Sequence, residues 1–468
     1  MRIHCIGIGG IGVSALAQYY LEKDHQVSGS DLVSSELTDF LSRLPGNRGS
    51  STALPSGQKK GIEIFIGNKA EHIKSDLDLV IYSPAVKPDN PEYQEAIRLG
   101  VALKSYPEAL GELTRQYTTI AVSGSHGKST TTAMTALVLV AAGLDPTIIV
   151  GTKLKEFGNS NFRLGKSKYL VIEACEYDSS FEQYFPKITV VTNVDKEHLD
   201  YFKTFANVIK EFKKFILKLP TDGFLVANKD DPGLKKIIND QFLSINKFSI
   251  KQFSIKQPEA KKIAKILKVP GQHNVSNALA ALQVARILGV KDSVTFKSLS
   301  EFTGTWRRFE VKTAELRGNS RKKTRKITII SDYGHHPNEV SVTLRAARGK
   351  YPKKKIWLIF QPHQYQRTYY LFKDFVKVFK EAASAKASAG RRRIDQIIIA
   401  DIYDVAGREE KNINQKVSSE ILVKKIGRKN VQYMPMAEAE RLVKENIKSG
   451  EVLIIMGAGD IYKLVDKF

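Results

Sequence analysis

The chain has 468 residues, a length that favours about three domains over one. Hydrophobic residues make up 42% and charged residues 26%, an ordinary globular composition that argues against disordered, collagen-like and coiled-coil classes. No apolar run reaches the roughly 18 to 20 residues that a membrane-spanning helix needs, and the start MRIHCIGIGGIG lacks a signal-peptide pattern. With only two cysteines, Cys5 and Cys175, the composition predicts a cytoplasmic protein without a membrane partner.

The chain is strongly basic, with 73 lysines and arginines against 49 aspartates and glutamates and a net charge of +24. Such a balance raises nucleic acid as a partner. Half of this charge, however, comes from three segments rich in Gly, Ser or Ala, at 43–60, 318–326 and 381–394. Because no aromatic residues are interleaved with these bases, we interpret the segments as solvated insertions and expect no nucleic-acid partner.

Strand-like apolar runs alternate with helix-like runs almost to the end of the chain, which predicts an α/β fold built on parallel sheets. The runs fall into three blocks, and we expect domains at 1–115, 116–303 and 304–468. The expected strands are 2–8, 26–31, 62–67 and 78–84 in the first block, 118–125, 169–175, 188–194 and 223–228 in the second, and 327–334, 355–362, 396–403 and 451–459 in the third. The clearest expected helices are 128–143 and 273–289.

Gly7, Gly9 and Gly12 form a G-x-G-x-x-G pattern directly after the first expected strand, and Asp31 ends the next strand about 20 residues later. In this context glycines let backbone N–H groups approach a diphosphate at the start of a helix. The pattern therefore predicts a Rossmann-like domain that binds a diphosphate. It does not decide between NAD and another nucleotide.

A second glycine loop joins the expected strand 118–125 to the helix 128–143 and consists of Gly124, Ser125, His126, Gly127, Lys128, Ser129 and Thr130. Backbone amides and the helix N-terminus face an anion there and Lys128 adds a positive charge, so we expect a polyphosphate in this loop. A hydroxyl of Ser129 or Thr130 is suited to Mg²⁺, as in P-loop proteins. The spacing is G-x-x-G-K-S and differs from Walker A, because Val122 occupies the place of the earlier glycine.

Two further polar residues follow expected strands of the second block. Glu173 ends the run YLVIEAC, and His198 lies in NVDKEHLD, just after the run ITVVTNV. Open α/β sheets bind ligands at the carboxyl ends of their strands, so both residues are candidates for holding magnesium beside the phosphate loop. Taken singly, each residue is more often a solvated charge or a strand-end hydrogen-bonding group.

Together these segments resemble the Mur ligases of cell-wall synthesis. The resemblance rests on motifs in the family's order: GIGGIGVSALA with SGSD, SGSHGKSTTT, EACEYDSSF, TNVDKEHLD, GQHNVSNALAAL, GTWRRFE, DYGHHPNEV, FQPHQYQRT and GAGDI. They span nearly the whole chain apart from the basic insertions. The resemblance implies an N-terminal Rossmann-like domain that binds UDP, a central ATP-binding domain with a parallel-sheet, P-loop-like core, and a C-terminal Rossmann-like α/β domain that admits the amino acid.

The resemblance also implies a reaction. The enzyme would be an ATP- and magnesium-dependent ligase, monomeric or homodimeric, that joins L-alanine or a similarly small amino acid to the carboxylate of UDP-N-acetylmuramate through an acyl phosphate. The implied catalytic groups are Lys128, His198, Arg308 and His335. For ATP it implies Gly124, Ser125, His126, Gly127, Lys128, Ser129, Thr130, Asn274, Asn277, Arg308 and Asp332. For magnesium it implies Ser129 and Glu173 at one ion and His198 at a second. For the sugar nucleotide and the amino acid it implies Gly9, Gly10, Ile11, Gly12, Asp31, His335 and Arg367.

The chain departs from the family's pattern at several positions. Ser125 and Ser129 occupy places where the family usually shows threonines, which keeps the hydroxyls. Cys175 and Tyr177 replace the aspartate and the serine of the usual EADESD. Gln364 replaces the arginine of FQPHRYSRT, which removes a cation expected near the incoming carboxylate and leaves the identity of the amino acid open.

Three other functions stay open on the sequence alone. They are a ligase that attaches a whole peptide to the same sugar nucleotide, an NAD-dependent dehydrogenase, and a binding or scaffold protein with inactive nucleotide sites. A dehydrogenase would use the first glycine loop but would leave Lys128, Glu173 and His198 without a role. The peptide ligase differs from the amino-acid ligase in the third domain, where Gln364 lies.

Overall fold

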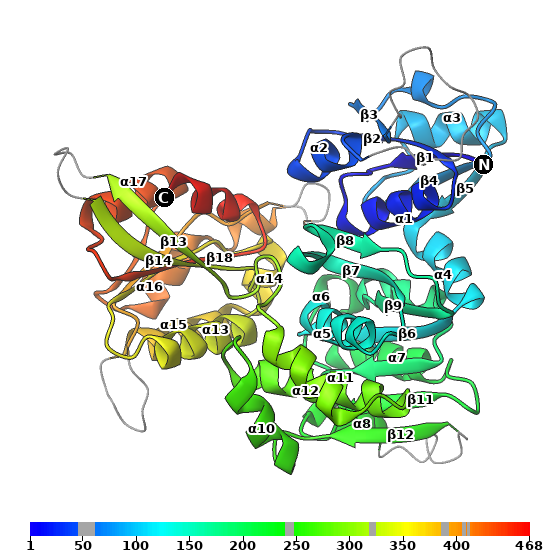
Figure 1. Cartoon of the computed structure of the whole chain (residues 1–468). Coiled ribbons are helices and arrows are strands. Elements are labelled where there is room, and N and C mark those ends of the chain that lie inside the picture. Colours follow the sequence, from blue (N-terminus) through cyan, green and yellow to red (C-terminus); the bar gives the residue numbers. More distant parts are fainter. Residues whose placement is uncertain (45–60, 239–247, 318–323, 385–392, 405–408, 410–411) are drawn as a thin grey trace. The chain divides into compact units, whose positions relative to one another are not determined.

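The computed structural model describes residues 1–44, 61–238, 248–317, 324–384, 393–404, 409 and 412–468, and Figure 1 shows the chain coloured along its sequence. Contacts within the chain divide it into two compact units. The first comprises Met1–Val194, Ile209–Gln257 and Asn277–Leu299, and the second comprises Asp195–Val208, Pro258–Ser276 and Ser300–Phe468. Within the described residues, no helix combines the length and the apolar character needed to cross a membrane.

The first unit begins with a five-stranded sheet in the order β3-β2-β1-β4-β5, with all neighbouring strands parallel. Its strands are β1 (Arg2–Ile6), β2 (Gln26–Asp31), β3 (Glu63–Ile66), β4 (Leu79–Tyr82) and β5 (Ala102–Ser105). Its helices are α1 (Ile11–Glu22), α2 (Glu36–Ser42), α3 (Pro91–Leu99) and α4 (Tyr106–Gln116), with a short turn η1 (Ala70–His72). The strand order reverses at β1, and open α/β sheets bind ligands beside such a position. The glycine turn after β1 therefore faces the expected ligand crevice.

Local capping explains where the last two helices of this sheet begin. At the start of α3, the side chain of Asn90 accepts hydrogen bonds from the N–H groups of Glu92 and Tyr93. At the start of α4, Ser105 and Glu108 form a reciprocal capping box. These caps satisfy N–H groups that have no partner inside the helix.

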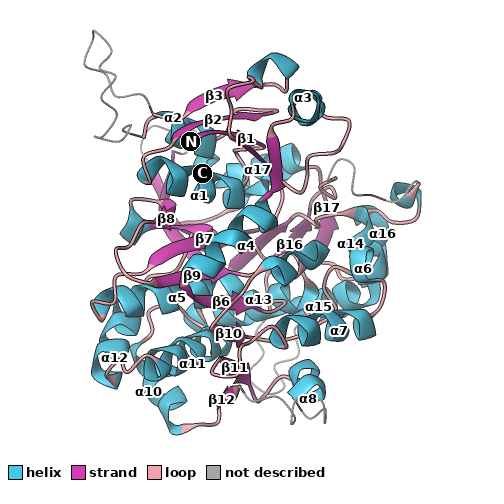
Figure 2. Cartoon of the chain, turned by 90° about the vertical axis from the view of Figure 1, so that its right-hand side faces the viewer, coloured by secondary structure: helices cyan, strands magenta, loops and turns pink. Residues whose placement is uncertain are grey.

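The first unit also contains a seven-stranded sheet in the order β12-β11-β10-β6-β9-β7-β8, whose strands lie one beside another in Figure 2. Its strands are β6 (Thr118–Ser123), β7 (Thr147–Leu154), β8 (Ser160–Arg163), β9 (Tyr169–Glu173), β10 (Ile188–Val191), β11 (Phe224–Asn228) and β12 (Ser249–Phe253). The helices of this stretch of sequence are α5 (Lys128–Ala141), α6 (Leu199–Phe202), α7 (Phe205–Ile216), α8 (Pro232–Ile238), α10 (Pro258–Ile266), α11 (Gln272–Ile287) and α12 (Asp292–Glu301), with short turns η2 (Lys155–Phe157) and η3 (Tyr177–Gln183). The pairing of β7 with β8 is antiparallel and the other described pairs are parallel. The central strands β9 and β10 are buried apolar runs because both of their faces are covered.

A buried polar network joins the two sheets of the first unit. Gln18 of α1 donates from its side-chain amide to Asn161 of β8 at 2.9 Å and accepts from the hydroxyl of Ser160 at 2.8 Å. Asn161 in turn donates to the hydroxyl of Ser14 at 3.0 Å and to the backbone carbonyl of Ile11. Buried polar groups with satisfied hydrogen bonds specify one geometry. The network therefore holds the start of α1, and with it the first glycine turn, against the second sheet.

The second unit is built on a six-stranded sheet in the order β13-β14-β18-β15-β16-β17. Its strands are β13 (Glu310–Arg317), β14 (Thr324–Asp332), β15 (Ile356–Phe360), β16 (Gln396–Ile399), β17 (Val431–Tyr433) and β18 (Val452–Met456). Its helices are α13 (Pro337–Lys350), α14 (Tyr365–Tyr370), α15 (Phe372–Ala383), α16 (Ser419–Ile426) and α17 (Met436–Asn446), with short turns η5 (Ile413–Gln415) and η6 (Asp460–Lys467). β13 and β14 pair antiparallel, the other described pairs are parallel, and an apolar core covers each face of the sheet.

The three sheets confirm the predicted α/β fold. The domain limits 1–115, 116–303 and 304–468 stay predictions, because the two compact units group the first two sheets together and divide the chain elsewhere.

Two of the predicted insertions include residues that belong to the sheet or to its core. Residues 324–326 belong to β14, and the guanidinium of Arg325 donates to the carbonyl of Ile447 at 2.7 Å. In the segment 381–394, the N–H of Ile394 donates to the carbonyl of Ala382 at 2.9 Å, and Ile394 is 2% exposed in the core beside α15. These ends are parts of the sheet and its core. The remaining parts of the predicted insertions, 45–60, 318–323 and 385–392, lie outside the described residues.

Candidate active site

The first glycine loop forms a tight turn between β1 and α1. Gly7 has a φ of 75°, in the left-handed region that favours glycine. The N–H groups of Gly7 and Ile8 both donate to the carbonyl of Ser30, at 2.8 and 2.9 Å. Gly9 donates its N–H to the carboxylate of Asp31 at 2.8 Å, and a side chain on Gly9 would meet that carboxylate. The structure thus brings the predicted glycine loop and Asp31 together, and Asp31 shapes the loop.

Gly12, in the first turn of α1, lies against Tyr106 at the start of α4. A Cβ atom on Gly12 would come within 2.6 Å of Cζ of the tyrosine ring, so close packing requires glycine here. Burial, and then the nearby Glu173 carboxylate, raise the pKa of Tyr106, so the phenol stays protonated. Tyr106 therefore lies near both the glycine loop and Glu173, and no pattern in the sequence had singled it out.

The second glycine loop joins β6 to α5 and is shaped by side chains that the sequence analysis missed. Gly124 has a φ of 134°, and a Cβ atom there would overlap the hydroxyl of Thr192. The side-chain carbonyl of Asn193 accepts the N–H of His126 at 2.8 Å. Gly127 has a φ of 82°, and a Cβ atom there would lie 2.6 Å from the amide oxygen of Asn277. The predicted ATP residue Asn277 therefore lies against the predicted phosphate loop.

Lys128 begins α5, and its ammonium turns back into the loop. It donates to the carbonyl of Gly124 at 2.7 Å and to that of Ser125 at 3.2 Å, and it forms an ion pair with Glu176 at 2.9 Å. Burial by itself would lower the pKa of Lys128, but its acidic neighbours, Glu176 first and Glu173 after it, together outweigh burial and the pKa is raised. The lysine is therefore charged at neutral pH. The sequence analysis did not identify Glu176. The feature of the sequence that could have indicated it is a second carboxylate three residues after Glu173 in EACEYDSSF.

Glu173 ends β9 beside the phosphate loop, because in the sheet register it lies opposite Val122. Its carboxylate accepts the N–H of Gly151 at 2.9 Å, and a side chain on Gly151 would overlap it. Ser129 lies in the first turn of α5 and is 4% exposed. Carboxylate and hydroxyl oxygens are ligands that magnesium prefers, so these residues fit a magnesium ion. Burial raises the pKa of the Cys175 thiol to about 12, so this replacement of the family's aspartate stays neutral.

Other predicted residues lie in the second unit. His198 is the residue before α6 and has a φ of 54°. The side-chain amide of Asn274 donates to the carbonyl of Pro270 at 2.7 Å. His198 and Asn274 are thus in one unit, whereas Glu173 and Asn277 are in the other. The magnesium set and the adenine pair predicted from the sequence stay predictions.

Asp332 ends β14 and holds the chain around Arg308. One carboxylate oxygen accepts the N–H of Phe309 at 2.8 Å, and the other accepts the N–H of Gly334 at 2.8 Å. Burial raises the pKa of Asp332, an effect that the positive charge of Arg308 opposes. The guanidinium of Arg308 lies 4.9 Å from the ring centroid of Tyr333 and 3.6 Å from the carboxylate of Glu339. The structure brings the predicted pair Arg308 and Asp332 together, with Asp332 positioning the backbone next to Arg308.

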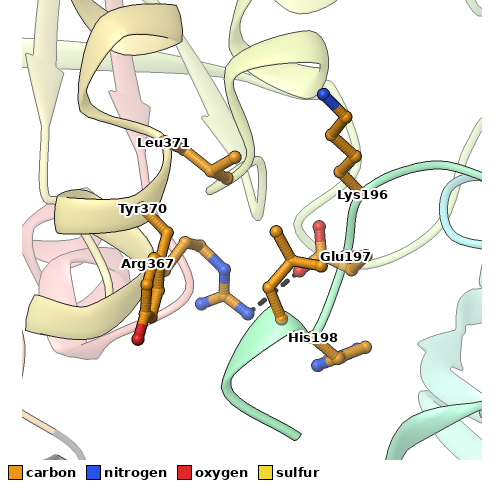
Figure 3. Close-up of a pocket in the computed structure, with 7 residues that line it drawn as sticks. Lys196, Glu197, His198, Arg367, Tyr370 and Leu371 are labelled. Carbon is orange, nitrogen blue, oxygen red and sulfur yellow. Dashed lines mark hydrogen bonds and ion pairs between the residues drawn. The ribbon is translucent and has the colours of Figure 1, made fainter. Parts of the chain in front are cut away.

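His335 and Arg367, the residues predicted on the amino-acid side, meet at Glu197, which the sequence analysis missed. Nη2 of Arg367 donates to Oε1 of Glu197 at 3.0 Å (Figure 3), and Nε2 of His335 lies 3.9 Å from the same oxygen. Burial by itself would raise the pKa of Glu197, but Arg367 and the neighbouring histidines outweigh burial and the pKa is lowered. Burial lowers the pKa of His335 to about 4, so its imidazole is neutral at pH 7.

A small hollow lies at this ion pair and is lined by Lys196, Glu197, His198, Leu199, Arg367, Tyr370 and Leu371. In Figure 3, Arg367 and Tyr370 come from α14, and the Lys196 side chain points away from Glu197. Gln364, the residue before α14, is 5% exposed and does not line the hollow. The lining contains one arginine, Arg367, and one lysine, Lys196. Among the described lining residues, Arg367 is the basic residue whose ion pair with Glu197 is seen. No second lysine or arginine of this described lining takes the place of the arginine that Gln364 replaces.

Three family models match the chain in sequence order. The model described as "Mur ligase family, catalytic domain" matches residues 2–44 and 49–118, "Mur ligase middle domain" matches 122–285, and "Mur ligase, glutamate ligase domain" matches 307–459. Together the three models cover most of the chain.

Curated relatives match over nearly the full length. The UDP-N-acetylmuramate–L-alanine ligase of Aquifex aeolicus is 40% identical over 484 residues, covering 100% of this chain and 97% of the relative. The enzyme of the same name from Alkaliphilus metalliredigens is 38% identical over 481 residues, covering 98% and 95%. Among solved structures, UDP-N-acetylmuramate-alanine ligase from Thermotoga maritima matches with a TM-score of 0.75 at 26% identity, covering 100% of this chain and 98% of that chain.

Proposed function

The chain belongs to the Mur ligase family, and from that premise we propose that it joins L-alanine to the carboxylate of UDP-N-acetylmuramate in an ATP-dependent step of peptidoglycan synthesis. The observation that carries the proposal is the match, over at least 98% of the chain, to relatives named for this reaction. We place the reaction in the cytoplasm, a reducing compartment that suits the free thiols of Cys5 and Cys175.

The chemistry explains why such a ligase needs a phosphate loop. A carboxylate does not react with an amine in water because oxide is a poor leaving group, so ATP must first convert it to an acyl phosphate. The ammonium of Lys128 is charged and lies inside the loop where phosphates would bind. On nucleotide binding, Lys128 would exchange Glu176 for phosphate oxygens and offset the charge of the transferring group. Positioning and electrostatics then supply most of the rate enhancement.

The proposed ATP and magnesium site extends from this loop. Ser129 and Glu173 would hold one magnesium ion and His198 a second, and magnesium when bound would neutralise charge on the phosphates. Their oxygen and imidazole donors support this role, as does the position of Glu173 opposite Val122 in the sheet. We further propose Asn274 and Asn277 for adenine, and Arg308 and Asp332 for the phosphates and ribose. The contact of Asn277 with Gly127 and the shared environment of Arg308 and Asp332 support these roles.

The sugar nucleotide and the amino acid would bind at the other predicted residues. Backbone amides of the turn containing Gly9, Gly10, Ile11 and Gly12 would bind the diphosphate of UDP, with Asp31 holding the turn in shape. Arg367 would bind the carboxylate of the amino acid, since a guanidinium pairs with a carboxylate through parallel hydrogen bonds. Neutral His335 adds no positive charge that would repel the α-ammonium group.

Phosphate release tests the proposal. The purified chain is mixed with ATP, magnesium and UDP-N-acetylmuramate, and a panel of single amino acids and short peptides is added in turn. We expect release with L-alanine, and slower release with glycine or L-serine. Absence of release with every acceptor would refute the ligase activity, whereas release with a peptide alone would refute L-alanine as the substrate. A dehydrogenase is disfavoured because it leaves the Lys128–Glu176 pair without a role.

A further inference from the structure

The pair formed by Arg367 and Glu197 is electrically neutral, which a site for a simple anion does not require. Arg367 could bind a carboxylate by itself, yet its guanidinium already pairs with a side chain that is 4% exposed. We infer that Glu197 recognises the α-ammonium group of the incoming amino acid while Arg367 binds its carboxylate, so that the hollow is built for a zwitterion. This inference rests on the proposed function and names how the two charges of that substrate are recognised.

The contacts of the pair leave room for this role. Nη1 of Arg367 lies 3.1 Å from both the carbonyl oxygen and Nδ1 of His363, and Nη2 donates to Oε1 of Glu197 at 3.0 Å. The other carboxylate oxygen, Oε2, is buried and has no hydrogen-bond partner among the described residues. The nearest imidazole nitrogens, Nε2 of His336 at 3.7 Å and Nε2 of His335 at 3.9 Å from the carboxylate, lie beyond hydrogen-bond distance. A buried carboxylate oxygen without a donor is uncommon and offers an acceptor to a ligand.

Charge balance favours a zwitterion over an anion in this hollow. When an amino acid binds, its carboxylate takes the place of Glu197 on Arg367, and Glu197 turns to the ammonium group. One ion pair is replaced by two, and no buried charge is left without a partner. A ligand that carries a carboxylate alone would leave Glu197 buried and unpaired, which is unfavourable in a site shielded from water. The apolar parts of Leu199, Tyr370 and Leu371 complete the lining and suit a small side chain.

The test separates the ammonium group from the carboxylate. The KM for L-alanine is measured beside the inhibition constant of propionate, which has the same carbon skeleton and carboxylate but no ammonium group. Both constants are measured for the wild type, for Glu197→Gln, which keeps the shape and removes the charge, and for Glu451→Gln. Glu451 is a matched control because it is a buried carboxylate of the same unit, bonded to Nε1 of Trp357 at 2.8 Å, and it precedes β18 at the amino end of that strand.

We expect Glu197→Gln to raise the KM for L-alanine about tenfold or more, as for the loss of one charge-assisted contact. The inhibition constant of propionate should stay the same or fall, and the KM for ATP and both constants of Glu451→Gln should be unchanged. Parallel weakening of L-alanine and propionate would overturn the inference, because Glu197 would then only position Arg367. An unchanged KM for L-alanine would also overturn it.

One measurement needs no variant and keeps the inference testable if Glu197→Gln does not fold. The wild type should bind propionate at least about tenfold more weakly than L-alanine, and equal affinities would overturn the inference. A wild type that releases no phosphate with any acceptor would instead refute the proposed function, and the inference with it.

Discussion

Replacing Lys128 by alanine should lower both the turnover and the melting temperature, because its ammonium pairs with a buried carboxylate. The side chains of Glu176 and Lys128 are 1% and 13% exposed. Removal of one partner from a buried ion pair costs about 3–5 kcal/mol, since the other charge stays buried without compensation. At about 2–4 °C per kcal/mol for a domain of the length predicted for 116–303, the melting temperature should fall by roughly 6–20 °C. Turnover should fall by about 10²–10³-fold, the usual loss when one group that stabilises the transition state is removed.

A second substitution separates these two effects. In the double variant Lys128→Ala/Glu176→Gln the stranded charge is gone, so most of the lost melting temperature should return while turnover stays low. Thermal unfolding followed by circular dichroism and phosphate release from ATP provide the two measurements. Lys155→Ala, which removes an exposed lysine of the same unit, is the control and should change neither. Wild-type turnover in Lys128→Ala would refute its role at the phosphates, and an unchanged melting temperature would refute the energetic role of the ion pair.

Three further predictions concern the metal, an insertion and pH. Glu173→Ala and His198→Ala should each raise the magnesium concentration needed for half-maximal phosphate release. Glu71→Ala, which removes an exposed carboxylate, is the control and should not raise it. An unchanged magnesium dependence in both variants would contradict the proposal that Glu173 and His198 bind the metal. Deleting 385–392 should preserve turnover, because a backbone hydrogen bond already joins the flanking segments, and an inactive but folded deletion variant would argue against dispensability. Burial lowers the pKa of His273 from 6.5 to about 4, so between these values the unfolded chain binds a proton that the folded chain does not. Stability should therefore fall as pH decreases from 7 to 5, by about 2 kcal/mol at this residue, and melting curves of His273→Gln should show a weaker pH dependence.

Local patterns were sufficient to predict much of the fold and part of the site. Each glycine loop lies between an apolar strand and a helix, and Gly7, Gly124 and Gly127 adopt backbone conformations that favour glycine. These features depend on residues close together in the sequence, so they are visible in it. The same holds for Lys128 at the start of α5 and for Glu173 at the end of β9.

Other features depended on contacts between distant parts of the chain. The limits of the insertions were misjudged because Arg325 and Ile394 look like parts of polar segments, whereas their structural roles come from a carbonyl near α17 and from the core beside α15. Tyr106 was missed because its packing against Gly12 joins two helices far apart in the sequence.

The sequence by itself determined the α/β class, the two glycine loops and the order of the motifs, because these follow from short-range periodicity and backbone conformation. Only the tertiary structure decided which carboxylates pair with Lys128 and Arg367. Glu176 is 48 residues from Lys128 and Glu197 is 170 residues from Arg367, and in the sequence both are ordinary acidic residues. The free energy of a charged group depends on its burial and on its partner, and both are set by long-range packing.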